Sequence, residues 1–143
     1  NMAIPILSDV GIQGGLTIDG GFSFQQQTTS TLIHSSGAFG VDFNTGANYY
    51  ICNATSGTHN HSISFANISS NVGQSGTIII NNPSDVSSLT WASPALPSTA
   101  YTPGGSAITF NLTASKIAVM TYFIASSTKV LINYVGNFSS YPQ

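Results

Sequence analysis

The sequence predicts an all-β protein, and three observations support this fold class. Residues that favour helices are scarce, because the chain has no Glu, no Arg, only two Lys and only seven Leu. Ile, Val and Thr, whose branched side chains favour strands, together account for 37 of the 143 residues. Short apolar runs alternate with Gly, Asn, Ser and Pro, and no run shows the apolar repeat of an amphipathic helix. We therefore expect an antiparallel β-sandwich or a jelly-roll-like barrel.

The clearest expected strands are 116–125 and 129–135, and the short polar segment between them predicts a β-hairpin. Because both faces of 116–125 are largely apolar, we place this strand in the centre of a sheet. Prolines interrupt residues 93–105, which therefore cannot pair continuously and should form a long loop across one end of the sandwich. The other expected strands are 38–43, 47–54, 61–66, 76–81, 87–91 and 107–112.

Residues 1–37 differ from the remainder of the chain. Residues 11–21 are rich in glycine with apolar residues at alternating positions, and residues 25–31 are polar. Large apolar residues are too few here to form a core of their own. We expect an extended Gly-rich N-terminal arm or strand system that packs on another surface, including that of another copy, and a β-sandwich domain over residues 38–143. Residues 2–7 lack the basic region of a signal peptide.

Ionisable residues are unusually rare, since charged residues make up 4% of the chain against about 25% in typical domains. Ser, Thr, Asn and Gln, 55 residues together, supply the polar surface instead. Two cations cannot form a basic patch, so we expect no binding to nucleic acid or anionic lipid. No apolar run is long enough for membrane insertion. The formal net charge of −2 gives little repulsion between copies, which suits a protein held in a large assembly. The charged residues are Asp9, Asp19, Asp42, Asp85, Lys116 and Lys129.

No arrangement of residues predicts catalysis, so we expect no catalytic, cofactor-binding or metal-binding residue, no cofactor and no enzymatic activity. The four Asp are widely spaced in turn-like contexts, where their side chains bond the local backbone. Paired glycosidase carboxylates and a Ser-His-Asp triad are weaker alternatives, and no Gly-x-Ser-x-Gly motif is present. Cys52 is the only cysteine and has no adjacent cation, so we expect a buried thiol on a strand.

His59 and His61 form the one pattern with potential for metal chemistry. On a strand, both rings would point to one face, and three copies around a threefold axis would supply six imidazoles for a transition metal. The alternative, which we favour, is a polar loop leading into the strand at 61–66.

The order of several motifs resembles a β-rich module of tail-fibre-like and other virion proteins of tailed phages. The motifs are the segments 41–50, 72–80, 88–91 and 118–123, and the similarity covers roughly residues 41–138. In that module Gly-Gln-Ser-Gly, here Gly73 to Gly76, opens a strand, and a Trp, here Trp91, ends the next one. We expect the two glycines to allow positive φ around a tight turn, and Trp91 to cap the core or a subunit contact.

The resemblance implies a non-enzymatic structural protein of the bacteriophage particle exterior, in a tail fibre, a spike or a capsid decoration. The expected location is the virion, after assembly in the host cytoplasm. The expected partners are further copies of the chain, with a homotrimer favoured, other virion proteins and a host surface glycan.

An extracellular carbohydrate-binding or adhesin β-sandwich module is the alternative function. The aromatic rings that contact a sugar in such a module would come from Tyr49, Tyr50, Tyr101 and Tyr122. The four Asp are scattered along the chain and make a poor calcium site.

Overall fold

The computed structural model describes residues 30–34, 37–45, 47, 49–54, 60–82, 89–110 and 112–142. Within these ranges the regular structure consists of strands and three short 3-10 helices, which confirms the all-β prediction. The elements are β1 (Ser30–His34), β2 (Gly37–Asp42), η1 (Phe43–Thr45), β3 (Tyr49–Ala54), β4 (Asn60–Ala66), η2 (Ser69–Asn71), β5 (Ser75–Asn81), β6 (Thr90–Trp91), β7 (Ala100–Tyr101), η3 (Pro103–Gly105), β8 (Ile117–Ser126) and β9 (Lys129–Phe138).

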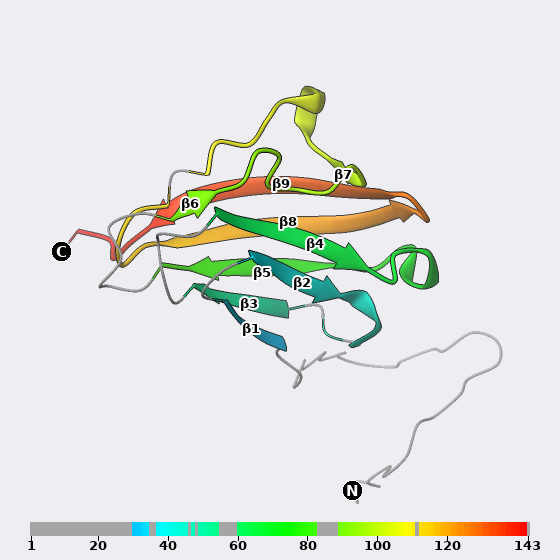
Figure 1. The fold of residues 1–143 in the computed structure, drawn as a ribbon, viewed down its shortest axis with the longest axis horizontal. Helices are drawn as coiled ribbons and strands as arrows, with labels where there is room; N and C mark the ends of the chain where they lie inside the picture. Colours follow the sequence, from blue (N-terminus) through cyan, green and yellow to red (C-terminus); the bar gives the residue numbers. More distant parts are fainter. Residues whose placement is uncertain are drawn as a thin grey trace, which may run out of the picture.

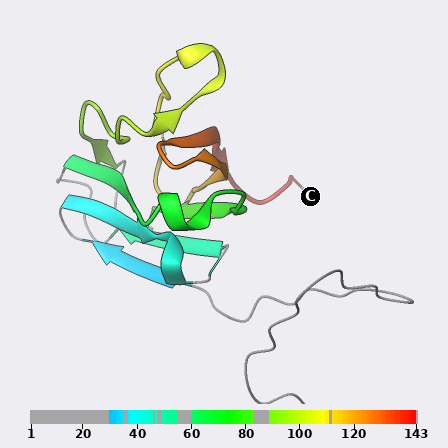
Figure 2. The ribbon, with the colours of Figure 1, turned by 90° about the vertical axis from the view of Figure 1, so that its right-hand side faces the viewer.

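The strands form two sheets that enclose the core between them. The larger sheet has the order β1-β3-β5-β8-β9-β7, and the smaller has the order β2-β4-β6. Figures 1 and 2 show the smaller sheet lying over one part of the larger sheet. The prediction of a two-layer β architecture is therefore confirmed.

The first six strands form a coil in which the chain alternates between the two sheets. Strands β1, β3 and β5 pair in parallel in the larger sheet, and β2, β4 and β6 pair in parallel in the smaller sheet. The expected antiparallel pairing is therefore wrong for this part of the molecule. The physical reason is that each connection crosses to the opposite sheet, so a strand pairs with the strand two steps further along the chain.

Antiparallel pairing occurs where the sequence predicted a hairpin. Strand β8 pairs with β9, and its other edge pairs antiparallel with β5. This confirms both the hairpin and the central position of the strand predicted at 116–125. Strand β9 continues to Phe138, three residues beyond the expected end.

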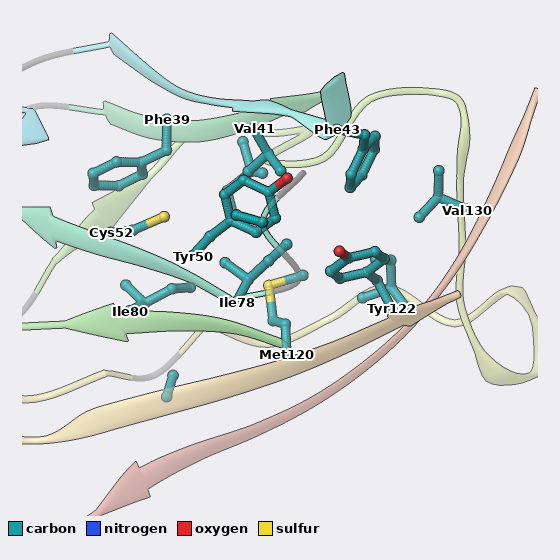
Figure 3. Packing of buried hydrophobic residues seen from close by; sticks show 14 of the residues in the cluster. Phe39, Val41, Phe43, Tyr50, Cys52, Ile78, Ile80, Met120, Tyr122 and Val130 are labelled. Carbon is teal, nitrogen blue, oxygen red and sulfur yellow. The ribbon is translucent and has the colours of Figure 1, made fainter. Parts of the chain in front are cut away.

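Strand alternation directs one set of side chains from each sheet into a common core. Strand β8, for example, buries every second residue from Ala118 to Ile124. Phe43, immediately after β2, connects the layers because its ring lies 5.5 Å from that of Phe65 and 5.1 Å from that of Tyr122. Figure 3 shows Phe43 and Tyr122 pointing toward one another across the core. The largest fully buried side chains include Tyr50, Phe39, Phe43, Ile78, Ile80, Leu112, Met120 and Ile124.

Two expected strands, 107–112 and 87–91, differ from the structure. Residues 107–110 and Leu112 do not form a strand that pairs with a neighbouring strand. Phe110 nevertheless packs on Trp91 and Tyr134. The apolar residues that alternate in this segment, Ile108, Phe110 and Leu112, therefore contact the core without taking part in strand pairing. The strand expected at 87–91 is present only as β6, and residues 83–88 lie outside the described residues.

The proline-rich segment contains the short strand β7, which pairs in parallel with the start of β9. The segment therefore pairs over two residues only, which agrees with the prediction that it cannot pair continuously. Residues 98–102 lie between Pro97 and Pro103 and keep their N–H groups, so pairing is possible there. Earlier in the segment, the carbonyl of Ala95 accepts a 2.8 Å hydrogen bond from the N–H of Ile63, which ties this part to β4.

The expected N-terminal arm lies largely outside the described residues, which begin at Ser30. Strand β1 falls within the range predicted for the arm, and it pairs with β3 of the same chain over five residues. The larger sheet therefore begins before the expected boundary at residue 38.

Candidate functional site

Asp42, at the end of β2, is the one side-chain carboxylate in the described ranges. Its Oδ1 accepts hydrogen bonds from Asn67 Nδ2 at 2.7 Å and from the N–H of Asn44 at 2.9 Å. These two bonds, that from Asn67 first, hold the pKa of Asp42 below its ordinary value of 3.8. The carboxylate thus stabilises a turn, as the sequence predicted for Asp, and it has no second carboxylate partner among the described residues. Asp9, Asp19 and Asp85 lie outside those residues.

Cys52 is fully buried on β3, which confirms the prediction of a strand thiol that faces the core. Burial raises the pKa of the thiol from 9.0 to about 12. The thiol is therefore protonated at neutral pH, whereas nucleophilic attack and metal binding both require the thiolate.

His61 is also fully buried, at the start of β4. Its ring stacks on Phe39 with centroids 5.6 Å apart, and it meets the ring of Trp91 edge-on at 6.0 Å. Because His61 points into the core of its own chain, it cannot reach a metal on an axis between copies in this conformation. His59 lies outside the described residues, and the described ranges contain no group of three or more His, Cys, Asp or Glu side chains placed to hold a metal.

Trp91 caps one edge of the core, as expected. Its ring stacks on Phe110 with centroids 4.4 Å apart, and it packs against the buried cluster. Beside this pair, the proline-rich segment and residues 105–110 enclose a groove of about 570 Å³ lined only by uncharged residues. Phe110 stacks on the Trp91 indole and His61 meets it edge-on, so the ring is engaged by contacts within the chain while it also lines the groove.

The Gly73-Gln74 turn, which lies between η2 and β5, is hydrogen-bonded to β8 of the hairpin. Gly73 has the positive φ that the sequence predicted, at +92°, whereas Gly76 lies within β5 and has no positive φ. The N–H of Gly73 donates to the carbonyl of Ile124, and the N–H of Ile124 donates to the carbonyl of Gln74. Gln74 Nε2 also donates to the carbonyl of Ala47 at 2.9 Å. The motif is therefore a structural junction.

The surface with the clearest capacity for binding is the outward side of β8 and β9. Five of its large apolar side chains, Ile117, Phe123, Leu131, Val135 and Phe138, are 40% to 54% exposed, which is uncommon for neighbouring residues on the surface of a monomer. The register places Val119 beside Val135 on one side and beside Ile79 of β5 on the other. We call this surface the outer apolar face, and we define it by Ile117, Val119, Phe123, Leu131, Val135 and Phe138.

The outer apolar face carries no charge. Lys116 precedes β8 and Lys129 is the first residue of β9, and because the two strands are antiparallel, the lysines lie at opposite ends of the hairpin. The polar groups between them are neutral, notably Thr121 and Asn133, which are directly paired across the two strands. Two copies that met through this face would bring no like charges together along its length.

A hollow of about 380 Å³ adjoins one end of the outer apolar face. Tyr101 and Pro103 form one side of it, and Phe123, Leu131 and Asn133 form the other. The ammonium of Lys129 lies 5.3 Å from the centre of the Tyr101 ring. We call this feature the β7–β9 hollow.

Comparisons of the chain with protein-family models, with curated proteins and with solved structures find no match. Among the described residues, no helix has the length and apolar character needed to cross a membrane.

The sequence indicated the outer apolar face only indirectly. The apolar character of both faces of 116–125 led us to a central strand, which is correct, but one of those faces is exposed. The signal for exposure was the alternation in 129–135, where Leu131, Asn133 and Val135 share the outward side. The β7–β9 hollow had no signal, because it depends on the pairing of β7 with β9.

Proposed function

We propose that the chain is a non-enzymatic structural protein of a bacteriophage particle exterior and that it assembles with copies of itself through the outer apolar face. The observation that carries the proposal is the exposure of several large apolar side chains on two adjacent, firmly paired strands with no charge among them. Covering such a surface with a partner lowers the free energy of the system, because apolar area is removed from water. An assembled virion protein, with a trimer favoured, would keep it covered.

Two further observations support this function. Among the described residues, Asp42 holds a turn, Cys52 and His61 are buried, and Lys116 and Lys129 lie at opposite ends of the hairpin, an arrangement that offers no acid-base pair or activated nucleophile. The order of the Gly-Gln-Ser-Gly turn, the Trp at the end of a short strand and the late hairpin also resembles the phage module. These observations favour assembly over catalysis.

The first experiment measures solution mass by analytical ultracentrifugation across a concentration series. We expect the native chain to form an oligomer, and Leu131→Asp to weaken association by more than about 100-fold, because a buried unpaired carboxylate costs several kcal/mol. Ser70→Asp, which adds the same charge at an exposed position of η2, is the matched control and should leave the mass unchanged. A native chain that stays monomeric, or a Leu131→Asp variant that still assembles, would contradict the proposal.

A second experiment tests the particle itself. Phage particles that carry the gene are purified on a density gradient and analysed by mass spectrometry. Peptides of this chain should co-migrate with the particles at a stoichiometry of several copies each. Their confinement to the soluble fraction of the lysate would overturn the assignment to the virion while leaving self-association untouched.

A further inference from the structure

The β7–β9 hollow is suited to receive an aromatic side chain with a hydroxyl group. Tyr101, Phe123 and Leu131 offer it apolar surface, and each of these side chains is more than 40% exposed as the chain stands alone. Thr121 and Asn133 add a hydroxyl and an amide to the lining. No charged side chain lines the hollow, so an occupant need not carry a compensating charge.

Tyr141 is an exposed aromatic residue of the required kind. It is 84% exposed, the highest fraction among the large apolar side chains described. It follows β9 on a segment that makes no strand, and Figure 1 shows this segment at the end of β9 that lies away from β7. Burying a tyrosine ring from such an exposed position against an apolar surface is favourable.

Tyr141 cannot fill the hollow of its own chain. Seven residues of strand separate Leu131 from Phe138, a distance of about 23 Å at about 3.3 Å per residue. The three residues from Phe138 to Tyr141 span at most about 10 Å when fully extended. Strand β9 is held to β8 along this length and cannot fold back. A second copy can supply the ring, because the surface around the hollow is uncharged up to Lys129 at its rim.

We infer that Tyr141 of one copy inserts into the β7–β9 hollow of a neighbouring copy. The inference rests on the proposed self-assembly and specifies one of its contacts. The ring packs between Tyr101, Phe123 and Leu131, and the phenol hydroxyl bonds to the neutral polar groups of the lining. Such a contact uses two different surfaces, so it closes a ring of copies or forms twice across a twofold axis.

The direct test replaces Tyr141 with the photo-crosslinking residue p-benzoylphenylalanine, which retains an aromatic ring. Isotope-labelled and unlabelled full-length chains are mixed, irradiated and digested. We expect cross-links that join a labelled peptide to an unlabelled one and map to residues 121–133 or 101–103. The same residue at Val72, which is 53% exposed beside η2, is the control and should not reach the hollow. Cross-links from position 141 that map to other segments would overturn the inference.

Affinity measurements separate this contact from assembly in general. Tyr141→Ala should weaken association at least about tenfold, as expected for a buried aromatic anchor, and Tyr141→Phe by less than about fivefold. If the native chain assembles but Tyr141→Ala leaves the dissociation constant unchanged, the inference fails and the proposed self-assembly stands. If the native chain is monomeric, both fail.

Discussion

The coil formed by β1–β6 and the hairpin formed by β8 and β9 share one core but present different outward surfaces. The outward residues of the smaller sheet are small or polar, including Ala38, Gly40, Ser62 and Ser64. The outward residues of the hairpin include Phe123 and Leu131, each 45% exposed. The core needs the inward faces of both regions, whereas in the part of the chain that the structure describes the neighbouring large apolar side chains that are 40% or more exposed lie on the outward face of the hairpin. Substitutions on the two sides of the hairpin can therefore test whether stability depends on the inward side and the proposed assembly on the outward side.

The largest effect is expected where the coil and the hairpin meet. Phe43→Ala should lower the free energy of unfolding by about 3–5 kcal/mol, since the ring is fully buried against Phe65 of the coil and Tyr122 of the hairpin. Denaturant unfolding monitored by circular dichroism should show one cooperative transition. The measurement is made in the Leu131→Asp background so that assembly does not contribute.

The matched control is Phe123→Ala, which removes the same side chain from the outer apolar face. Its free energy of unfolding in that background should change by less than about 1 kcal/mol, because the ring is 45% exposed. Equal losses for the two variants, or two separate transitions after Phe43→Ala, would show that the two regions do not share a core as described.

A smaller effect is expected at the Gly73-Gln74 turn, which is hydrogen-bonded to β8 of the hairpin. Gly73→Ala should destabilise the chain by about 1–2 kcal/mol, because a side chain is strained at a φ of +92° even though an added Cβ meets nothing within 4 Å. Gly40→Ala on β2 is the control, since Gly40 has no positive φ and an added Cβ would lie 3.8 Å from Ser64 Oγ, an ordinary contact. Thermal melts of both variants measure the difference in stability. A Gly73→Ala variant as stable as the native chain would exclude strain at this turn.

The smallest effect concerns alkaline pH. Burial raises the pKa of Cys52 to about 12 and raises that of Tyr122 and Tyr134, so the fold favours their protonated forms. For such groups the stabilisation is complete below the ordinary pKa and is lost as pH rises toward the folded-state value. The melting temperature should therefore begin to fall above pH 9.0, the ordinary value of the thiol. Cys52→Ala should delay that onset toward 10.0, the ordinary value of tyrosine, and an unchanged onset would contradict this cause.

At acidic pH the dependence of stability on pH has the opposite sign. The pKa of Asp42 is lowered by its bonds from Asn67 and Asn44, so its contribution is present above pH 3.8 and is lost as pH falls through the lowered value.

Local signals in the sequence were sufficient for the hairpin and insufficient for the coil. The run from Lys116 to Val135 contains two apolar segments with a polar turn, so neighbours in sequence are neighbours in the sheet. The pairing of β3 with β5 brings together residues that are 28 positions apart in the sequence, such as Tyr49 and Thr77. No local pattern in the sequence predicts which distant segments pair. The same limit applies to the candidate site, since the outward residues of β9 could be read from alternation but the adjoining hollow required β7 to pair with β9.

The only sulfhydryl of the chain lies at the centre of β3, with no accessible surface. A particle protein of the kind proposed is made in a reducing cell and released into an oxidising medium. Because oxidation to a disulfide or a sulfenic acid requires an accessible thiolate, Cys52 remains a free thiol in both environments while the fold is closed. Passage between them therefore leaves the covalent structure of this residue unchanged.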